Sequence, residues 1–197
     1  MPRAGLTPSV VTADAAAFAD EHGFEALTLA ALAKRLGVAT PSLYKHVDGL
    51  DGLRRAVSLL AVAELAERLQ ASAVGRSGPE ALRAVFASYR RYALEHPGRY
   101  SSIQRSPSPS DTEAQRLFAR PVEVITAVLR GFAIPDERMV HTIRALRSAL
   151  HGFVDLETRG GFGLPEDVDA SFALLTDGFL RQLEPVPDGG GPIGTGA

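Results

Sequence analysis

The chain has 197 residues, of which 45% are hydrophobic and 22% are charged; its formal net charge is −2 and it contains no cysteine. This composition is ordinary for a globular protein, and it excludes a disulfide framework, a thiol nucleophile and a cysteine-based zinc site. It also excludes a positive field over the whole molecule, so any attraction to phosphate must come from a local patch. We expect a cytoplasmic protein with no membrane association, because cysteine is absent and no apolar run approaches the ~18 residues of a membrane span.

The first predicted helix starts at Thr7-Pro8, where a capping residue precedes a proline at the first helical position. It is expected to end at Gly23. A second helix is predicted over residues 28–36, because apolar residues recur there at the 3.6-residue period of a helix face. Thr28 is its expected N-cap, and Gly37 is its expected end, where a left-handed residue often follows a helix.

A third helix is predicted over residues 40–47, with Thr40 as its cap and Pro41 at its first position. Leu43 and Val47 lie four residues apart and would turn this helix toward the second one. The pair has the pattern of a helix-turn-helix, whose second helix enters the major groove of DNA. The alternative is a plain αα-hairpin. DNA binding is favoured because the exposed face is polar, aromatic or basic and carries no acid; its residues are Thr40, Ser42, Tyr44, Lys45 and His46.

The remaining predicted elements are all helical. A long helix over residues 51–73 connects the N-terminal unit to the rest of the chain, and Ser77 with Glu80 fits a capping box at the start of the next helix. Further helices are predicted over residues 77–95, 99–105, 111–132 with an interruption at Pro121, 135–159 and 165–183. Residues 106–110 are expected to form a loop, and the tail over residues 185–197, rich in proline and glycine, is expected to be disordered.

The predicted fold class is therefore all-α, with about nine helices. A three-helix DNA-binding domain occupies residues 1–50, and a larger helical bundle occupies residues 51–184. Gly152 and Gly178 lie inside helical patterns, where glycine is costly, so we expect close packing at both positions. No Gly-x-Ser-x-Gly or HExxH motif is present, and His141 and His151 are too far apart for joint metal ligation. We expect no catalytic residues, no metal and no cofactor.

The N-terminal motifs resemble those of the tetracycline-repressor (TetR) family of transcriptional regulators. The resemblance covers about residues 7–57 and rests on Gly23-Phe24, Thr28-Leu29, Leu32-Ala33, Leu36-Gly37-Val38 and Ser42-Leu43-Tyr44-Lys45-His46-Val47. A second segment, Leu150-His151-Gly152-Phe153 followed by Leu156-Glu157 and Gly160-Gly161-Phe162, is similar to one C-terminal subclass of that family. This subclass often has a tryptophan before the His-Gly pair, and this chain has none.

The resemblance implies a homodimer that binds a palindromic double-stranded DNA operator and releases it when a small-molecule effector enters the C-terminal domain. It implies phosphate contacts from Thr28 and Tyr44, base contacts from Thr40, Pro41 and Ser42, and backbone or base contacts from Lys45 and His46. The family usually has a lysine near the start of its fourth helix, but Leu50 stands there in this chain. Arg54 is the alternative source of that contact.

The aromatic residues of the bundle are typical of a core, and the resemblance implies a ligand cavity among them. The candidate ligand-binding residues are Phe86, Tyr89, Phe118, Arg147, His151 and Phe153. Two-fold dimerisation is expected through residues 135–183. The sequence leads us to expect a ligand-responsive regulator, with a helical small-molecule-binding protein or scaffold without DNA binding, or a helical enzyme, as the alternatives.

Overall fold

The computed structural model describes residues 5–183 and shows nine α-helices, one short 3-10 helix and no strand within that range. The all-helical prediction is confirmed. The predicted tail over residues 185–197 lies outside the described residues. The elements are α1 (Pro8–His22), η1 (Phe24–Ala26), α2 (Leu29–Leu36), α3 (Thr40–Leu43), α4 (Gly49–Ala73), α5 (Gly78–Glu95), α6 (Pro97–Ser102), α7 (Thr112–Leu129), α8 (Asp136–Thr158) and α9 (Val168–Leu183).

Helices α1 to α3 and the first part of α4 share one hydrophobic core. Helix α1 begins as predicted, because the Thr7 side chain accepts a hydrogen bond from the Val10 N–H at 3.2 Å. The core contains fully buried Val11, Leu32 and Leu43 together with Leu53 and Val57 of α4. Replacing one such leucine by alanine typically costs about 2–5 kcal/mol, so these contacts fix how α2 and α3 are presented.

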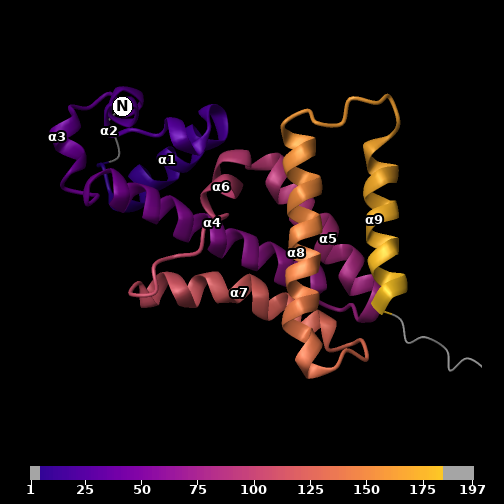
Figure 1. Ribbon diagram of the computed structural model, residues 1–197. Helices are drawn as coiled ribbons and strands as arrows, with labels where there is room; N and C mark the ends of the chain where they lie inside the picture. The colour runs from indigo at the N-terminus through magenta and orange to yellow at the C-terminus, as the bar shows by residue number, and fades with distance from the viewer. Residues whose placement is uncertain (1–4, 184–197) are drawn as a thin grey trace, which may run out of the picture.

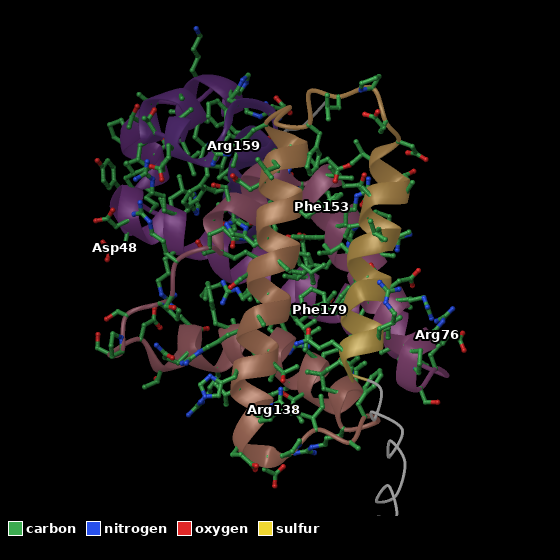
Figure 2. All side chains as sticks on the ribbon, turned by 45° about the vertical axis from the view of Figure 1, so that its right-hand side comes forward. Asp48, Arg76, Arg138, Phe153, Arg159 and Phe179 are labelled. Carbon is green, nitrogen blue, oxygen red and sulfur yellow. The ribbon has the colours of Figure 1, made fainter. Side chains whose placement is uncertain are left out.

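Helix α4 connects this unit to a second, larger core. It runs from the N-terminal helices into the middle of the molecule, where it packs against α5 and α7 (Figure 1). Its residues Ala61, Val62, Leu65 and Leu69 belong to the second core, together with buried Phe86 and Tyr92 of α5. Helices α8 and α9 run side by side at the opposite end of the molecule from α3, as Figures 1 and 2 show.

Two predicted helix starts are wrong in detail. Ser77 precedes α5, but its side chain makes no capping hydrogen bond, and Glu80 instead lies 3.2 Å from Arg76. The predicted capping box is therefore absent, and the Glu80 carboxylate pairs with Arg76, four residues before it, instead of with the backbone at Ser77. The last helix is predicted to start at Pro165 but begins three residues later, at Val168, after a bend in the chain.

Helix α4 begins at Gly49 instead of residue 51, and α6 spans Pro97–Ser102 instead of residues 99–105. Further differences concern α3 and α7. Ala39, not Thr40, is the N-cap residue of α3, and regular helix ends at Leu43 instead of Val47. The chain continues as turns to Val47, whose N–H still bonds to the Leu43 carbonyl at 3.0 Å. Helix α7 continues through Pro121 without interruption. The packing of its apolar face against the core compensates for the hydrogen bond that proline removes.

Candidate functional site

The segment from Thr28 to Val47 is held in place by a cap, a left-handed glycine and two buried side chains. Thr28 accepts a hydrogen bond from the Ala31 N–H at 3.1 Å, as its sequence position predicts. Gly37 ends α2 with φ at 67°, a conformation that glycine adopts without strain. Leu43 is fully buried and Val47 is 9% exposed, and these two residues anchor the segment on the N-terminal core.

The predicted DNA-contacting residues all reach the surface, at the end of the molecule that α3 occupies in Figure 1. Tyr44 is 60% exposed, which is unusual for an aromatic side chain that could pack inward. Pro41, Lys45 and Thr28 are exposed, while the remaining three are half-buried at the edges of the same surface: Thr40, Ser42 and His46. Among the described residues of this face there is no acid, so nothing here repels phosphate.

The basic residues of the N-terminal helices differ in whether they are paired with acids. Arg35 donates two hydrogen bonds to Glu21, at 2.6 and 2.9 Å, and a third to Asp14 at 3.2 Å. The bond from Arg35 lowers the pKa of the Glu21 carboxyl. Arg35 therefore fastens α2 to α1 and is not a free charge for a ligand. Within residues 5–183, Lys34 and Lys45 form no ion pair and remain free to meet a phosphate.

Leu50 cannot make the phosphate contact that a lysine would make at this position, and Arg54 does not replace that contact directly. Leu50 is half-buried at the start of α4. The Arg54 guanidinium donates to the Glu25 carbonyl at 3.2 Å and lies over the Phe24 ring at 5.7 Å. Arg54 therefore stabilises η1, the short helix that leads into Thr28. In this way it positions Thr28 and does not itself act as a free charge on the predicted DNA-contacting surface.

A cavity of about 90 Å³ lies inside the larger core, between α4, α5, α7 and α8. Its lining includes four of the six predicted ligand-binding residues: Phe86, Tyr89, Phe118 and Arg147. The volume is that of about three water molecules. An open groove of about 550 Å³ lies next to it and shares Phe118, Val122 and Arg147 with it, so these three residues form the boundary between cavity and solvent.

His151 does not line the cavity, but hydrogen bonds through Tyr100 connect it to Tyr89 in the cavity wall. Its Nδ1 lies 2.7 Å from the Tyr100 hydroxyl, which lies 2.9 Å from the hydroxyl of Tyr89 in the cavity wall. Burial raises the pKa of Tyr89 and, with the neighbouring phenol, that of Tyr100. Both phenols are therefore neutral near pH 7, and each has one hydrogen to donate along this chain.

Phe153 is placed elsewhere. Its ring packs against Phe162 and Phe172, with centroids 4.9 and 5.2 Å apart, and the Arg90 guanidinium lies 5.8 Å from it. This cluster holds α9 and the α8–α9 connection on the body, about one helical turn beyond Leu150, the last residue of α8 that lines the cavity. Phe153 is among the residues labelled in Figure 2.

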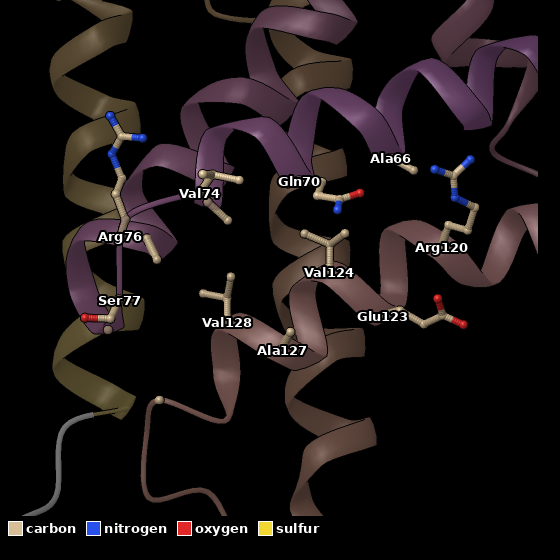
Figure 3. A pocket seen from close by; sticks show the side chains of 14 residues that line it. Ala66, Gln70, Val74, Arg76, Ser77, Arg120, Glu123, Val124, Ala127 and Val128 are labelled. Carbon is tan, nitrogen blue, oxygen red and sulfur yellow. The ribbon is translucent and has the colours of Figure 1, made fainter.

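A further groove, about 510 Å³, lies between the end of α4, the α4–α5 turn and α7 (Figure 3). Its walls are mostly small side chains such as Ala66, Ala127 and Val128, and it is open to solvent. Apolar ligands are usually enclosed by larger aliphatic and aromatic side chains, so the inner cavity fits a small-molecule site better. Within residues 5–183 no group of three His, Asp or Glu side chains could hold a metal ion, and no helix is long and apolar enough to cross a membrane.

Comparisons with known proteins agree with this layout. A model of bacterial regulatory proteins of the tetR family matches residues 11–57, and a model of the tetracyclin repressor-like C-terminal domain matches residues 82–179. An uncharacterized HTH-type transcriptional regulator of Mycobacterium tuberculosis is 38% identical over 182 residues, covering 90% of this chain and 80% of that protein. The chain belongs to the TetR family. It is a transcriptional regulator with an N-terminal DNA-binding domain and a C-terminal domain of TetR type.

Two other proteins show the same likeness. The uncharacterized HTH-type transcriptional regulator YobS of Bacillus subtilis is 32% identical over 184 residues, covering 92% of this chain and 95% of that protein. The crystal structure of the TetR-family regulator PfmR from Thermus thermophilus superposes with a TM-score of 0.67 at 25% identity, covering 89% of this chain and 99% of that one.

In this TetR-family chain, sequence reasoning predicted a helix near α6 but not the contacts that α6 makes. Ile103 and Gln104 follow it directly and line the inner cavity, while Tyr100 within it bonds to Tyr89. At its other end, Gly98 approaches α1 so closely that an added Cβ would lie 1.9 Å from the Ala19 carbonyl oxygen. The short His-Pro-Gly segment was the available signal in the sequence, but the contact itself depends on the fold.

Proposed function

We propose that this regulator is a ligand-responsive repressor that binds a palindromic operator as a homodimer and releases it when a small molecule enters the C-terminal domain. The observation that carries the proposal is the acid-free surface around α3, presented by buried Leu43 and Val47. We infer a cytoplasmic, non-enzymatic protein, since a regulator of this type works where the DNA is.

On this surface each contact has a physical basis. Lys45 supplies a free charge, and the exposed Tyr44 hydroxyl can donate to a phosphate oxygen. The Thr28 oxygen already accepts from Ala31, but its own O–H remains able to donate at the N-terminus of α2, where the helix dipole favours an anion. Thr40, Pro41 and Ser42 stand at the start of the recognition segment, the part that meets base edges in a helix-turn-helix.

The outer faces of α8 and α9 support dimerisation. They expose apolar side chains at Leu156 and Leu174, which are 49% and 68% exposed. Gly152 has no heavy atom within 4 Å of an added Cβ, and Gly178 has only the end of its own helix neighbour Arg181, at 4.0 Å. The close packing expected at both glycines is therefore absent within one protomer, and a second copy can supply it across an isologous interface.

A route from cavity to DNA surface runs through α6. A ligand that displaces Tyr89, Tyr100 or Ile103 acts on α6 directly. Helix α6 is bonded to α1, because the Arg99 N–H donates to Asp20 at 2.9 Å, and the Gly98 backbone lies against Ala19. Helix α1 in turn holds α2 through Arg35. A shift of α6 is thereby transmitted to the recognition unit, which needs no rearrangement of its own core.

The experiment is fluorescence anisotropy with DNA from upstream of the chain's own coding region, at several salt concentrations, against a scrambled duplex of equal length. We expect tight binding to the native duplex, with two protomers per site, and at least about 10³-fold weaker binding to the scrambled one. Equal binding to both duplexes would refute a specific operator in this DNA, and no binding to either would favour a helical small-molecule-binding protein or scaffold without DNA binding.

A further inference from the structure

The inner cavity has one charged group, and that group has no partner. Among residues 5–183, fifteen side chains line the cavity; twelve are apolar, and the others are Tyr89, Gln104 and Arg147. No acid is among them. Arg147 forms no ion pair or hydrogen bond within the described residues, whereas Arg90 and Arg99 of the same domain are each paired with two carboxylates.

The position of Arg147 indicates where the negative charge of a ligand could bind. It lines both the cavity and the adjoining open groove, so it stands at the mouth and is exposed. Its guanidinium is near enough to Tyr89 and Tyr100 for its charge to oppose the rise in their pKa values that burial causes. Arg147 and Tyr89 therefore both line the cavity, whose other walls are almost entirely apolar.

We propose that the effector is a monocarboxylic acid with an apolar body, held by its carboxylate at Arg147 and Tyr89. This inference rests on the proposed function, because it names the ligand class of the same cavity. A guanidinium fork matches a carboxylate, and a hydrogen bond with charged partners is about twice as strong as a neutral one. The apolar body enters among Leu65, Phe86 and Ile125, where a chain of several methylenes must push the side chains apart, because the cavity holds only about 90 Å³. The head group stays at the mouth, where part of its hydration is kept.

The hydrogen-bond chain behind Tyr89 gives this binding mode a second signature. When Tyr89 donates its only hydrogen to the carboxylate, its oxygen must accept from Tyr100. Tyr100 then has no hydrogen left for His151, so Nδ1 of His151 must carry a proton and donate to Tyr100. Acid binding therefore fixes His151 with Nδ1 protonated, whereas the empty cavity allows the chain to run in either direction.

The test compares octanoate, octanol and octylammonium by isothermal titration of the purified full-length protein. We expect octanoate to bind at least tenfold more tightly than octanol and octylammonium not to bind. Shortening octanoate to hexanoate should weaken binding about fourfold for each methylene removed from the cavity. The Arg147→Gln variant should lose at least tenfold for octanoate and leave octanol unchanged. Arg144→Gln, an exposed residue on the same helix that lines neither hollow, is the matched control and should bind like the wild type.

Several results would overturn the proposal: octanol binding as tightly as octanoate, octanoate binding unchanged in Arg147→Gln, or no binding of any of the three probes. Nitrogen-15 NMR of His151 supplies an independent check, and an unprotonated Nδ1 in the octanoate complex would rule out the Tyr89 contact. Measuring operator binding of the same protein without any probe distinguishes failure of the proposed repressor function from failure of the proposed acid site. Loss of operator binding refutes the repressor but not the acid site, and retained operator binding without octanoate binding refutes only the acid site.

Discussion

Replacing Gly98 by alanine should damage the junction between α6 and α1 more than any ordinary glycine-to-alanine change. The added Cβ would lie 1.9 Å from the Ala19 oxygen, 2.1 Å from the Ala19 carbonyl carbon and 2.6 Å from the Asp20 nitrogen. All three are backbone atoms, so no side-chain rotation relieves the clash. Helix α6 would have to move by about 1.5 Å to restore an ordinary van der Waals distance.

The cost of that movement has two parts. Overpacking of a dense contact costs about 1–3 kcal/mol. The shift also stretches the bonds from Arg99 to Asp20, whose side chains are only 18% and 14% exposed. Alanine's better helix propensity returns ~1 kcal/mol. We expect a net loss of about 2 kcal/mol in the free energy of unfolding, which for a chain of this size lowers Tm by roughly 4–8 °C.

The assay is urea and thermal unfolding followed by circular dichroism at fixed protein concentration. Gly163→Ala is the matched control, because Gly163 has nothing within 4 Å of an added Cβ, and its change should stay within about 0.5 kcal/mol. If Gly98→Ala unfolds within about 1 kcal/mol of the wild type, then α6 and α1 are not in the close contact on which the proposed signal route depends.

Two further predictions concern ion pairs. Arg90→Met should lower the free energy of unfolding in urea by about 3 kcal/mol, because the side chains of Arg90 and Glu157 are only 14% and 15% exposed. Arg83→Met, on the exposed side of the same helix, should lower it by less than about 1 kcal/mol. Equal losses in the two variants would contradict this prediction. The hydrogen bond from Arg55 lowers the pKa of Asp111 to about 2, so the stabilisation from this carboxylate is present above its ordinary pKa near 3.8 and is lost as the pH falls toward 2. Asp111→Asn, which keeps a capping side chain, should therefore flatten the pH dependence of Tm between about pH 4 and 2, and an unchanged acid limb would refute the assignment.

The helices were largely predictable because their signals are local. The Thr28 cap and the Gly37 end need only a few neighbouring residues, and the structure keeps both. Helix α3 is shorter than its sequence predicts, since Tyr44 to His46 follow the helical period but form turns in the structure. That shortening depends on how Val47 leads into α4, which no local pattern records.

The candidate site was predictable only in part, because side-chain directions depend on how helices rotate against one another. Phe118 and Phe153 look alike as periodic aromatic positions, yet one lines the cavity and the other packs under α9. Arg35 is basic and follows Lys34 directly in the sequence, but in the structure it pairs with two carboxylates of α1. Tyr100 and Gly98 gain their importance only from contacts between segments that are distant in the chain or lie on different helices.

The salt dependence of operator binding by Lys45→Ala tests the central claim most directly. Lys45 is exposed and unpaired within the described residues, so its loss should leave the fold intact, with a change in stability below ~0.5 kcal/mol. In a fluorescence titration over a range of salt concentrations, the account predicts weaker binding to all sequences and a slope of log K against log [salt] that is smaller by roughly one. Arg116→Ala, an exposed position on α7 far along the chain, should change neither quantity. Unchanged affinity and slope in Lys45→Ala would contradict the assignment of the α3 surface to DNA.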